Sequence, residues 1–377
     1  MRLQPLGRGC PLLFCLFFLL PFVGVAQDSS SLFSKGKLYG QVFGDYFFKS
    51  HADSLGRGKN QYGGDPDNGN GFEIRRVYLG YQYTFSDRFS ANILLESTWQ
   101  HDNLSLYIKY ANLSWKNLFP GSDLFLGRIK TPTYSTLTGK LWGYRAVERS
   151  ISDMHGNPSY DLGIALRGQL DERGHWGYSV MVGNGTGNDP ASDRYKKFYG
   201  ELYRKLLGDR LILDLYADYE RLRWRPGYHQ SAAMFKLAVA YQTPGFTIGV
   251  EGYRQRLQNG AALELDGRTD TLNVDNYAVS AFAHGTFAPQ WGYFARLDHF
   301  IPVAADRPDD GQLHSLVPAY DAGYHSRFIT AGIDYTPLKQ VHIMPNIWLC
   351  RYKNSLGAPQ TDYDMVYRLT FFFKFEG

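Results

Sequence analysis

Five cationic side chains could bind anions, because each one falls at an alternating position of a segment patterned like a β-strand. A guanidinium offers five N–H donors and keeps its charge, so it can hold an anion without being neutralised. Alternation along a strand brings such side chains to one face. We expect that face to line an aqueous interior. The residues are Arg76, Arg128, Lys130, Arg167 and Arg296.

Carboxylates are predicted on the same interior face and could pair with these cations. The acids concerned are Glu96, Asp161, Asp214, Asp218, Asp298, Asp334 and Asp364. Two interpretations stay open. Either the cations form a ring that attracts anions, or acids and bases neutralise one another. Because the charges are mixed, the sequence predicts only a mild preference for anions, and strong phosphate selectivity does not follow.

The segment from Thr131 to Tyr160 joins two predicted strands and is rich in aromatic and charged residues. A bare barrel of about sixteen strands would leave a wide lumen, which a loop folded inside would narrow. We expect this segment to form that constriction; the alternative is an ordinary surface loop at the rim. Its charged candidates are Lys140, Arg145, Glu148 and Arg149.

A second arginine cluster falls where a predicted strand ends. Arg221, Arg223 and Arg225 share one face, which strict alternation turns outward. There the phosphates of lipopolysaccharide could be their partners. A local β-bulge would reverse the direction of these side chains.

The elements that must position these residues are strands of period two. At the end of the chain every second residue from Tyr363 to Phe375 is large and apolar, and polar residues lie between. About sixteen such segments follow one another, which predicts a transmembrane antiparallel β-barrel. The segments are 38–48, 74–85, 88–98, 104–115, 124–130, 161–170, 176–183, 198–206, 211–220, 233–242, 246–256, 277–287, 291–300, 328–335, 341–350 and 363–375.

The connections between these segments alternate between short and long, as do the short periplasmic turns and long extracellular loops of outer-membrane barrels. Ser86-Asp87 and Gly208-Asp209 are typical of the short set. The long set comprises residues 49–71, 131–160, 184–197, 258–276 and 301–327.

The N-terminus has the pattern of a secretion signal. Arg2 and Arg8 precede an apolar stretch from Pro11 to Val25, and small residues end at Ala26. We therefore expect residues 1–26 to be a signal peptide and residues 27–377 to be a single barrel domain in the outer membrane of a Gram-negative bacterium. Of the three cysteines, Cys350 alone would remain, so no intramolecular disulfide is expected.

Several other functions find little support in the residues. The formal net charge of +4 includes no basic domain or tail, so we expect no nucleic-acid partner. The ten histidines are scattered without a zinc-binding pattern. We expect no catalytic residues, no metal and no cofactor, because no Ser/His/Asn or Asp/His cluster can be assembled at one rim. A surface-binding barrel without transport and, with less support, a barrel hydrolase remain alternatives.

Four short motifs resemble the phosphate-selective porin O/P family of Gram-negative bacteria. Phe72 to Gly80 is similar to its F-x-x-R-R strand, and Gly127 to Pro132 resembles its G-x-x-K-x-P segment. Similar stretches follow at 148–150 with 161–163, and at 178–184. The resemblance implies a trimeric porin of sixteen strands whose third long loop narrows the channel. Its function would be the passive diffusion of small hydrophilic solutes, with lipopolysaccharide and lipid as surroundings.

Overall fold

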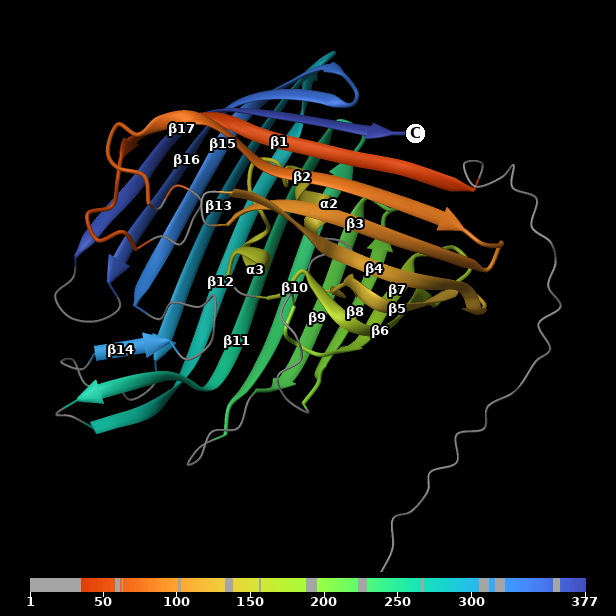
Figure 1. Cartoon of the computed structure of the whole chain (residues 1–377), viewed down its shortest axis with the longest axis horizontal. Helices are drawn as coiled ribbons and strands as arrows, with labels where there is room; N and C mark the ends of the chain where they lie inside the picture. The colour runs from red at the N-terminus through yellow and green to blue at the C-terminus, as the bar shows by residue number, and fades with distance from the viewer. Residues whose placement is uncertain are drawn as a thin grey trace, which may run out of the picture. The chain divides into compact units, whose positions relative to one another are not determined.

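The strands of this chain close into an antiparallel β-barrel, drawn in Figure 1. The computed structural model describes residues 35–57, 62, 64–100, 103–132, 138–155, 157–187, 195–222, 229–265, 268–304, 312–315, 323–354 and 360–377. The predicted signal peptide, residues 1–26, lies outside this set, and residues 35–377 form one compact unit.

Of the seventeen described strands, all but β14 form the wall, which gives sixteen. Each wall strand pairs with its neighbours in sequence, and β1 pairs with β17 to close the ring. This confirms the predicted fold class. The strands are β1 (Gly36–His51), β2 (Asn70–Thr84), β3 (Phe89–Gln100), β4 (Asn103–Phe119), β5 (Ser122–Lys130), β6 (Tyr160–Gln169), β7 (Trp176–Gly183), β8 (Lys197–Leu206), β9 (Leu211–Arg221), β10 (Ser231–Thr243), β11 (Phe246–Leu265), β12 (Arg268–Ala288), β13 (Trp291–Ala304), β14 (Gln312–Ser315), β15 (Tyr324–Leu338), β16 (Val341–Asn354) and β17 (Thr361–Glu376).

The two faces of the wall differ in polarity as the alternation predicts. In β10, Phe235 and Leu237 are 56% and 45% exposed, whereas Lys236 between them is fully buried. In β17, Leu369 is exposed on the outside and Arg368 is buried inside. An apolar outside around a charged inside is the reverse of a soluble barrel, and it matches a wall surrounded by hydrocarbon.

Two predictions about the connections need correction. Residues 258–276 were expected to be a long loop, but β11 and β12 continue through most of that range as a paired hairpin. Their register shifts between Leu257 and Ala261. In addition, β14 pairs with the extension of β11 inside the predicted loop 301–327. Periodicity fades there because a hairpin outside the wall has no fixed apolar side, so its residues resemble a loop.

A β-bulge in β2 changes which side chains reach the lumen. Phe43 of β1 opposes Arg76, and the next residue, Gly44, opposes Ile74, so Arg75 is the extra residue. A bulge lets two consecutive side chains depart from strict alternation. Arg75 is 5% exposed and contacts the interior acid Asp45. Strict parity had assigned only Arg76 to the interior.

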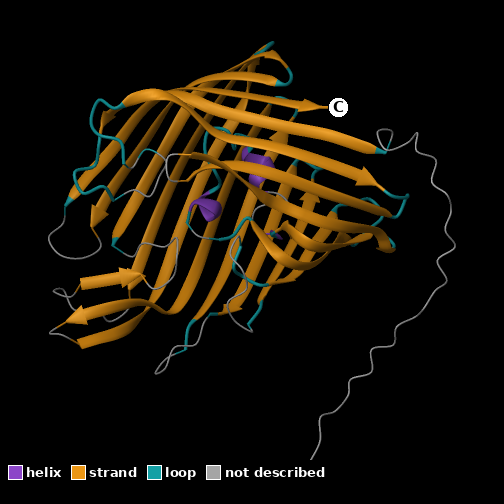
Figure 2. Ribbon diagram, viewed as in Figure 1, coloured by secondary structure: helices purple, strands orange, loops and turns teal. Residues whose placement is uncertain are grey.

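Two short helices interrupt the connection between β5 and β6: α2 (Thr138–Trp142) and α3 (Ile151–Met154). Figure 2 shows both helices within the ring of strands. In the part of the chain that the structure describes, no helix is long and apolar enough to cross a membrane.

Candidate functional site

The connection between β5 and β6 lies against inward-facing side chains of the wall. Trp142 at the end of α2 packs edge-on against Phe282 of β12 and Phe294 of β13, with ring centroids 5.8 Å and 6.2 Å away. Both phenylalanines are buried on the interior face. The connection itself contributes Val147 and Ile151, which have no exposed surface. These contacts form an apolar core inside the barrel.

Polar contacts from four strands hold the same segment. His284 of β12 lies 2.7 Å from the Leu141 carbonyl oxygen. Tyr144 donates to Asp334 of β15 over 3.2 Å. Arg296 of β13 donates to the Arg149 carbonyl, and Arg75 of β2 donates to the Ala146 carbonyl. β12, β13 and β15 are neighbours in the wall, and β2 is separated from them by β16, β17 and β1, so the segment is attached to two separate regions of the wall.

Glu148 is a buried acid of the segment and has two hydrogen-bond donors as partners. It is 7% exposed and accepts hydrogen bonds from the Trp348 indole at 3.1 Å and from the Arg149 backbone N–H at 2.8 Å. Burial alone would raise the pKa of Glu148, but Arg149, its backbone N–H, Arg368 and Trp348 together lower this pKa to about 2. Glu148 is therefore an ionised anchor. Trp348 on β16 was not a predicted site residue, although its inward parity could have indicated it.

Tyr62, from the connection between β1 and β2, was also missed by the sequence reasoning. It is fully buried, donates to Asp45 over 2.7 Å, and lies 6.2 Å from the Trp348 ring. Asp45 in turn contacts Arg75, which holds the Ala146 carbonyl. Two connections thus meet in one interior network. A single tyrosine in a polar segment gave no periodic signal that could have revealed this.

The other predicted constriction residues have different surroundings. Lys140 is exposed. Arg145 forms an ion pair with Asp153 of α3 at 2.7 Å. Arg149 has a side chain that is 39% exposed and lies 3.6 Å from Glu148.

Two of the five predicted pore-lining cations are tied to interior acids. Arg76 pairs with Glu96 at 2.8 Å, and Lys109 pairs with the other oxygen of that carboxylate at 2.6 Å. Arg296 is 3% exposed and pairs with Asp298. It lies against the loop, and its donors are used on Asp298 and on the Arg149 carbonyl.

The remaining three cations lie on β5 and β6. Arg167 lies over the ring of Phe125 at 5.1 Å and donates to the Lys130 carbonyl. Lys130 is exposed at the end of β5. Arg128 opposes Leu162, which is 52% exposed on the outer face, so the register puts the Arg128 backbone position on that side. Yet Nε and Nη2 of Arg128 are inaccessible to solvent.

An interior pocket of about 580 Å³ lies beside the loop and extends to the short-turn end of the barrel. Lys130 and Arg145 line it together with Tyr160, and Lys339 and Lys374 line its far part. Glu376 is its sole carboxylate lining residue among those described, and Lys37 pairs with it. Basic residues thus outnumber carboxylates in the lining of this pocket.

In the predicted outer cluster, Arg221 is described by the structure. It is exposed, lies over the Tyr195 ring at 4.8 Å, and has its Nη2 3.0 Å from Nδ1 of His229. Arg223 and Arg225 lie outside the described residues. Among the described residues, no group of three or more His, Cys, Asp or Glu is placed to hold a metal ion.

Comparison with solved structures identifies similar barrels. The outer membrane channel DcaP of Acinetobacter baumannii matches with a TM-score of 0.66 at 12% identity, over 91% of this chain and 98% of that one. An anion-selective porin from Comamonas acidovorans gives 0.61 at 12%, over 90% and 99%. OmpT of Vibrio cholerae, expressed in the outer membrane, gives 0.58 at 11%, over 93% and 99%. No family model and no curated protein matches the sequence. At these identities the similarity concerns the fold.

Proposed function

We propose that this chain is an outer-membrane porin through which small hydrophilic solutes diffuse passively. The observation that carries the proposal is the polarity of the barrel: charged residues inside, apolar residues outside, and the segment between β5 and β6 attached within the ring. The fold similarity to an outer membrane channel and to an anion-selective porin supports it.

The proposed mechanism has two parts and involves no reaction. The segment between β5 and β6 limits the size of the solute, because it is fixed by Trp142 packing and by hydrogen bonds to several strands. The charges beside it bias which ions pass, as in other selective pores. Most interior cations contact acids, whereas Lys130, Lys339 and Lys374 of the pocket form no ion pair with a residue that the structure describes. We therefore propose a mild preference for anions.

Single-channel recording in planar bilayers tests this proposal. Replacing residues 138–154 by a short Gly/Ser linker should raise the conductance and admit larger sugars, because the wall strands pair without this segment. Glu172→Ala, a change at an exposed position of the turn between β6 and β7, is the control and should leave the exclusion limit unchanged. If the deleted variant inserts and both quantities stay the same, the segment does not form the constriction.

A surface-binding barrel without transport is the second candidate, and one observation favours it. Many interior charges are fully buried and paired, such as Lys49 with Asp364 at 3.0 Å, so the lumen is well filled. Absence of any conductance from correctly folded protein would favour this candidate over the porin.

The proposal also includes the surroundings of the protein. Residues 1–26 would be removed during export to the outer membrane of a Gram-negative bacterium, and the mature chain would form a homotrimer surrounded by lipid and lipopolysaccharide. N-terminal sequencing of protein from outer-membrane fractions checks the cleavage at Ala26. Chemical cross-linking in the membrane checks the trimer, which a ladder ending at monomer would contradict.

A further inference from the structure

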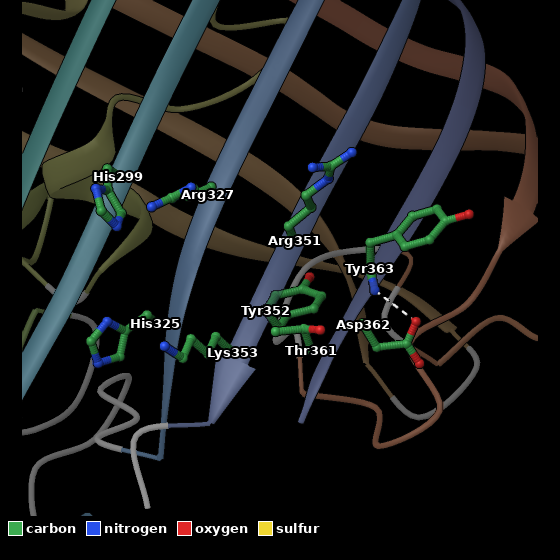
Figure 3. Close-up of a pocket in the computed structure, with 9 residues that line it drawn as sticks. All are labelled: His299, His325, Arg327, Arg351, Tyr352, Lys353, Thr361, Asp362 and Tyr363. Carbon is green, nitrogen blue, oxygen red and sulfur yellow. Dashed lines mark hydrogen bonds between the residues drawn. The ribbon is translucent and has the colours of Figure 1, made fainter. Parts of the chain in front are cut away.

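A cationic groove lies on the outer wall, at the end of the barrel that carries the longer connections. It encloses about 740 Å³ and is formed by β13, β15, β16 and β17 (Figure 3). We define the outer basic groove by its five basic lining residues, which are His299, His325, Arg327, Arg351 and Lys353. Asp362 is the sole carboxylate lining residue among those described.

The strand register places these side chains outside the barrel, in two rows. His299 opposes Val279, which is 53% exposed on the outer face, and His299 also opposes Arg327. Arg327 opposes Arg351, which opposes Tyr363. Directly opposed residues share a face, so the first row is outward. In the second row His325 opposes Lys353, and these two residues are two positions nearer the strand ends than Arg327 and Arg351.

Like charges directly opposite each other destabilise a sheet, so the Arg327–Arg351 pair needs a counter-charge. Neither arginine, nor Lys353, forms an ion pair with any residue that the structure describes. Both arginines and Lys353 are exposed. Asp362 forms no ion pair with either arginine; it accepts hydrogen bonds from the backbone N–H and hydroxyl of Ser54, at 2.9 Å and 2.7 Å, and lies 3.6 Å from His51.

The surface next to the groove, toward the middle of the wall, is apolar. Leu297, Ile329, Leu349 and Met365 oppose one another in that order, two residues further along their strands. Two residues along a strand correspond to roughly 7 Å. Leu297 is 51% exposed and Ile329 is 37% exposed. An amphipathic ligand would match this surface, with its anionic headgroup in the outer basic groove and its hydrocarbon chains over the apolar residues.

We propose that the outer basic groove binds the phosphoryl headgroup of a phosphorylated glycolipid in the outer leaflet. Arg327 and Arg351 would bind phosphate oxygens, since a guanidinium matches phosphate geometry with two parallel hydrogen bonds. Lys353 adds a third cation, and the acyl chains lie over Leu297 and Ile329. The inference rests on the proposed membrane location but not on transport. The ligand is inferred from the residues of the outer basic groove and not from the residues that line the lumen.

Native mass spectrometry of the detergent-solubilised protein tests the proposal, with diphosphorylated lipid A and its dephosphorylated form as probes. The wild type should retain the diphosphorylated lipid, and the R327Q/R351Q variant should bind it about tenfold more weakly or worse, because each lost arginine removes a charge-assisted contact. Arg254→Gln is the matched control. Arg254 is also an outward arginine of the wall, but Asp275 pairs with it at 3.1 Å, so its loss should change nothing.

Three results would overturn the proposal. Equal lipid retention by the wild type and R327Q/R351Q would show that the groove does not bind the headgroup. Displacement of the bound lipid by millimolar inorganic phosphate would indicate a site for free anions. If R327Q/R351Q no longer forms the oligomer but its monomer still retains the lipid, this face is a contact between subunits. If the double variant fails to fold, Lys353→Gln serves instead. Channel conductance should be unaffected, so failure of the porin proposal would be seen separately.

Discussion

At the scale of single residues, most interior charges are neutralised by a specific partner. Glu96 joins Arg76 and Lys109, and Lys197 lies 3.4 Å from Asp218 and 3.6 Å from Glu220. A buried charge needs such compensation, because desolvation otherwise costs several kcal/mol. What matters for ion selectivity is therefore the small number of cations whose charge is not compensated, and Lys130 is the clearest predicted one.

Lys130→Glu should move the reversal potential in a salt gradient toward cation selectivity. The substitution reverses a charge in the cationic pocket beside the loop, where low-dielectric walls focus the potential. The shift should shrink in molar salt, where the screening length falls to ~3 Å. Arg173→Glu, on an exposed turn between β6 and β7, is the control and should shift little. An unchanged potential at low salt would remove Lys130 from the conduction path.

Glu148→Gln should loosen the segment between β5 and β6. A carboxylate accepts from both Trp348 and the Arg149 N–H, whereas an amide has one oxygen and turns its NH₂ toward one of these donors. Leaving a buried donor unpaired costs roughly 1–3 kcal/mol. We expect larger open-channel noise in bilayer recordings. Glu172→Gln, at an exposed turn, should behave like the wild type, and equal noise in the two variants would contradict the anchor role.

The same anchor should depend on pH in one direction. Because the pKa of Glu148 is lowered from 4.5 to about 2, its stabilisation is complete above pH 4.5 and is lost as the pH falls toward 2. Open-channel noise of the wild type should therefore increase on acidification across that window. The Glu148→Gln variant should not show this increase in noise, although the other acids titrate equally in both proteins. An increase of equal size in the variant would assign the effect to those other acids.

At the scale of the strands, alternation was enough to predict nearly the whole wall. All sixteen predicted segments are strands. The acids Asp214 and Asp218 of β9 are buried as predicted, and apolar residues of β17 such as Tyr367 and Leu369 are exposed on the outside. The reason is physical: a single-residue slip would expose a charge such as Lys236 to hydrocarbon, so the sequence must specify the register strictly. Alternation does not predict the structure at the Arg75 bulge or in the β11–β12 extension, where the register is less strictly specified.

The site was less predictable than the wall, because its contacts are not periodic. The composition of residues 131–160 indicated a loop of functional interest, but it could not identify Trp348, Tyr62 or Arg75 as its neighbours. Those contacts join residues far apart in sequence, for example Trp348 and Glu148, which are separated by 200 positions. Their pairing depends on the three-dimensional course of the connections, which a single sequence does not specify.

Leu237→Arg should destabilise the barrel in lipid vesicles by ~2–4 kcal/mol, the cost of an outward cation near the middle of a membrane. Leu237 is at the centre of β10 and is 45% exposed on the outside. Leu211→Arg, at the end of the paired strand β9, is the depth control and should cost only ~0–1 kcal/mol. Urea unfolding in vesicles measures both. Equal costs would mean that Leu237 does not face hydrocarbon.

At the scale of the whole molecule, none of the sixteen described wall strands has a free edge. Every wall strand has two neighbours, and the ring closes between β1 and β17 over twelve paired positions from Tyr39 to His51. Closure satisfies the backbone donors and acceptors without water, which is the condition for crossing a membrane with strands. It also makes the fold cooperative around the ring.

The folded barrel should therefore resist SDS at room temperature. Unboiled protein should migrate differently from boiled protein on a gel, because a closed ring of hydrogen-bonded strands resists unfolding by the detergent. Circular dichroism of the unboiled sample should be rich in β-structure. Identical migration, or a helical spectrum, would contradict the barrel.

The closure between β1 and β17 also links completion of the fold to completion of the chain. β1 is made first and β17 last, yet each supplies the hydrogen-bonding partner of the other. Any product that stops before Thr361 would leave β1 and β16 with open edges, and open edges recruit other strands. A chain that lacks β17 therefore cannot close its ring, and its open strand edges stay accessible to proteases and chaperones.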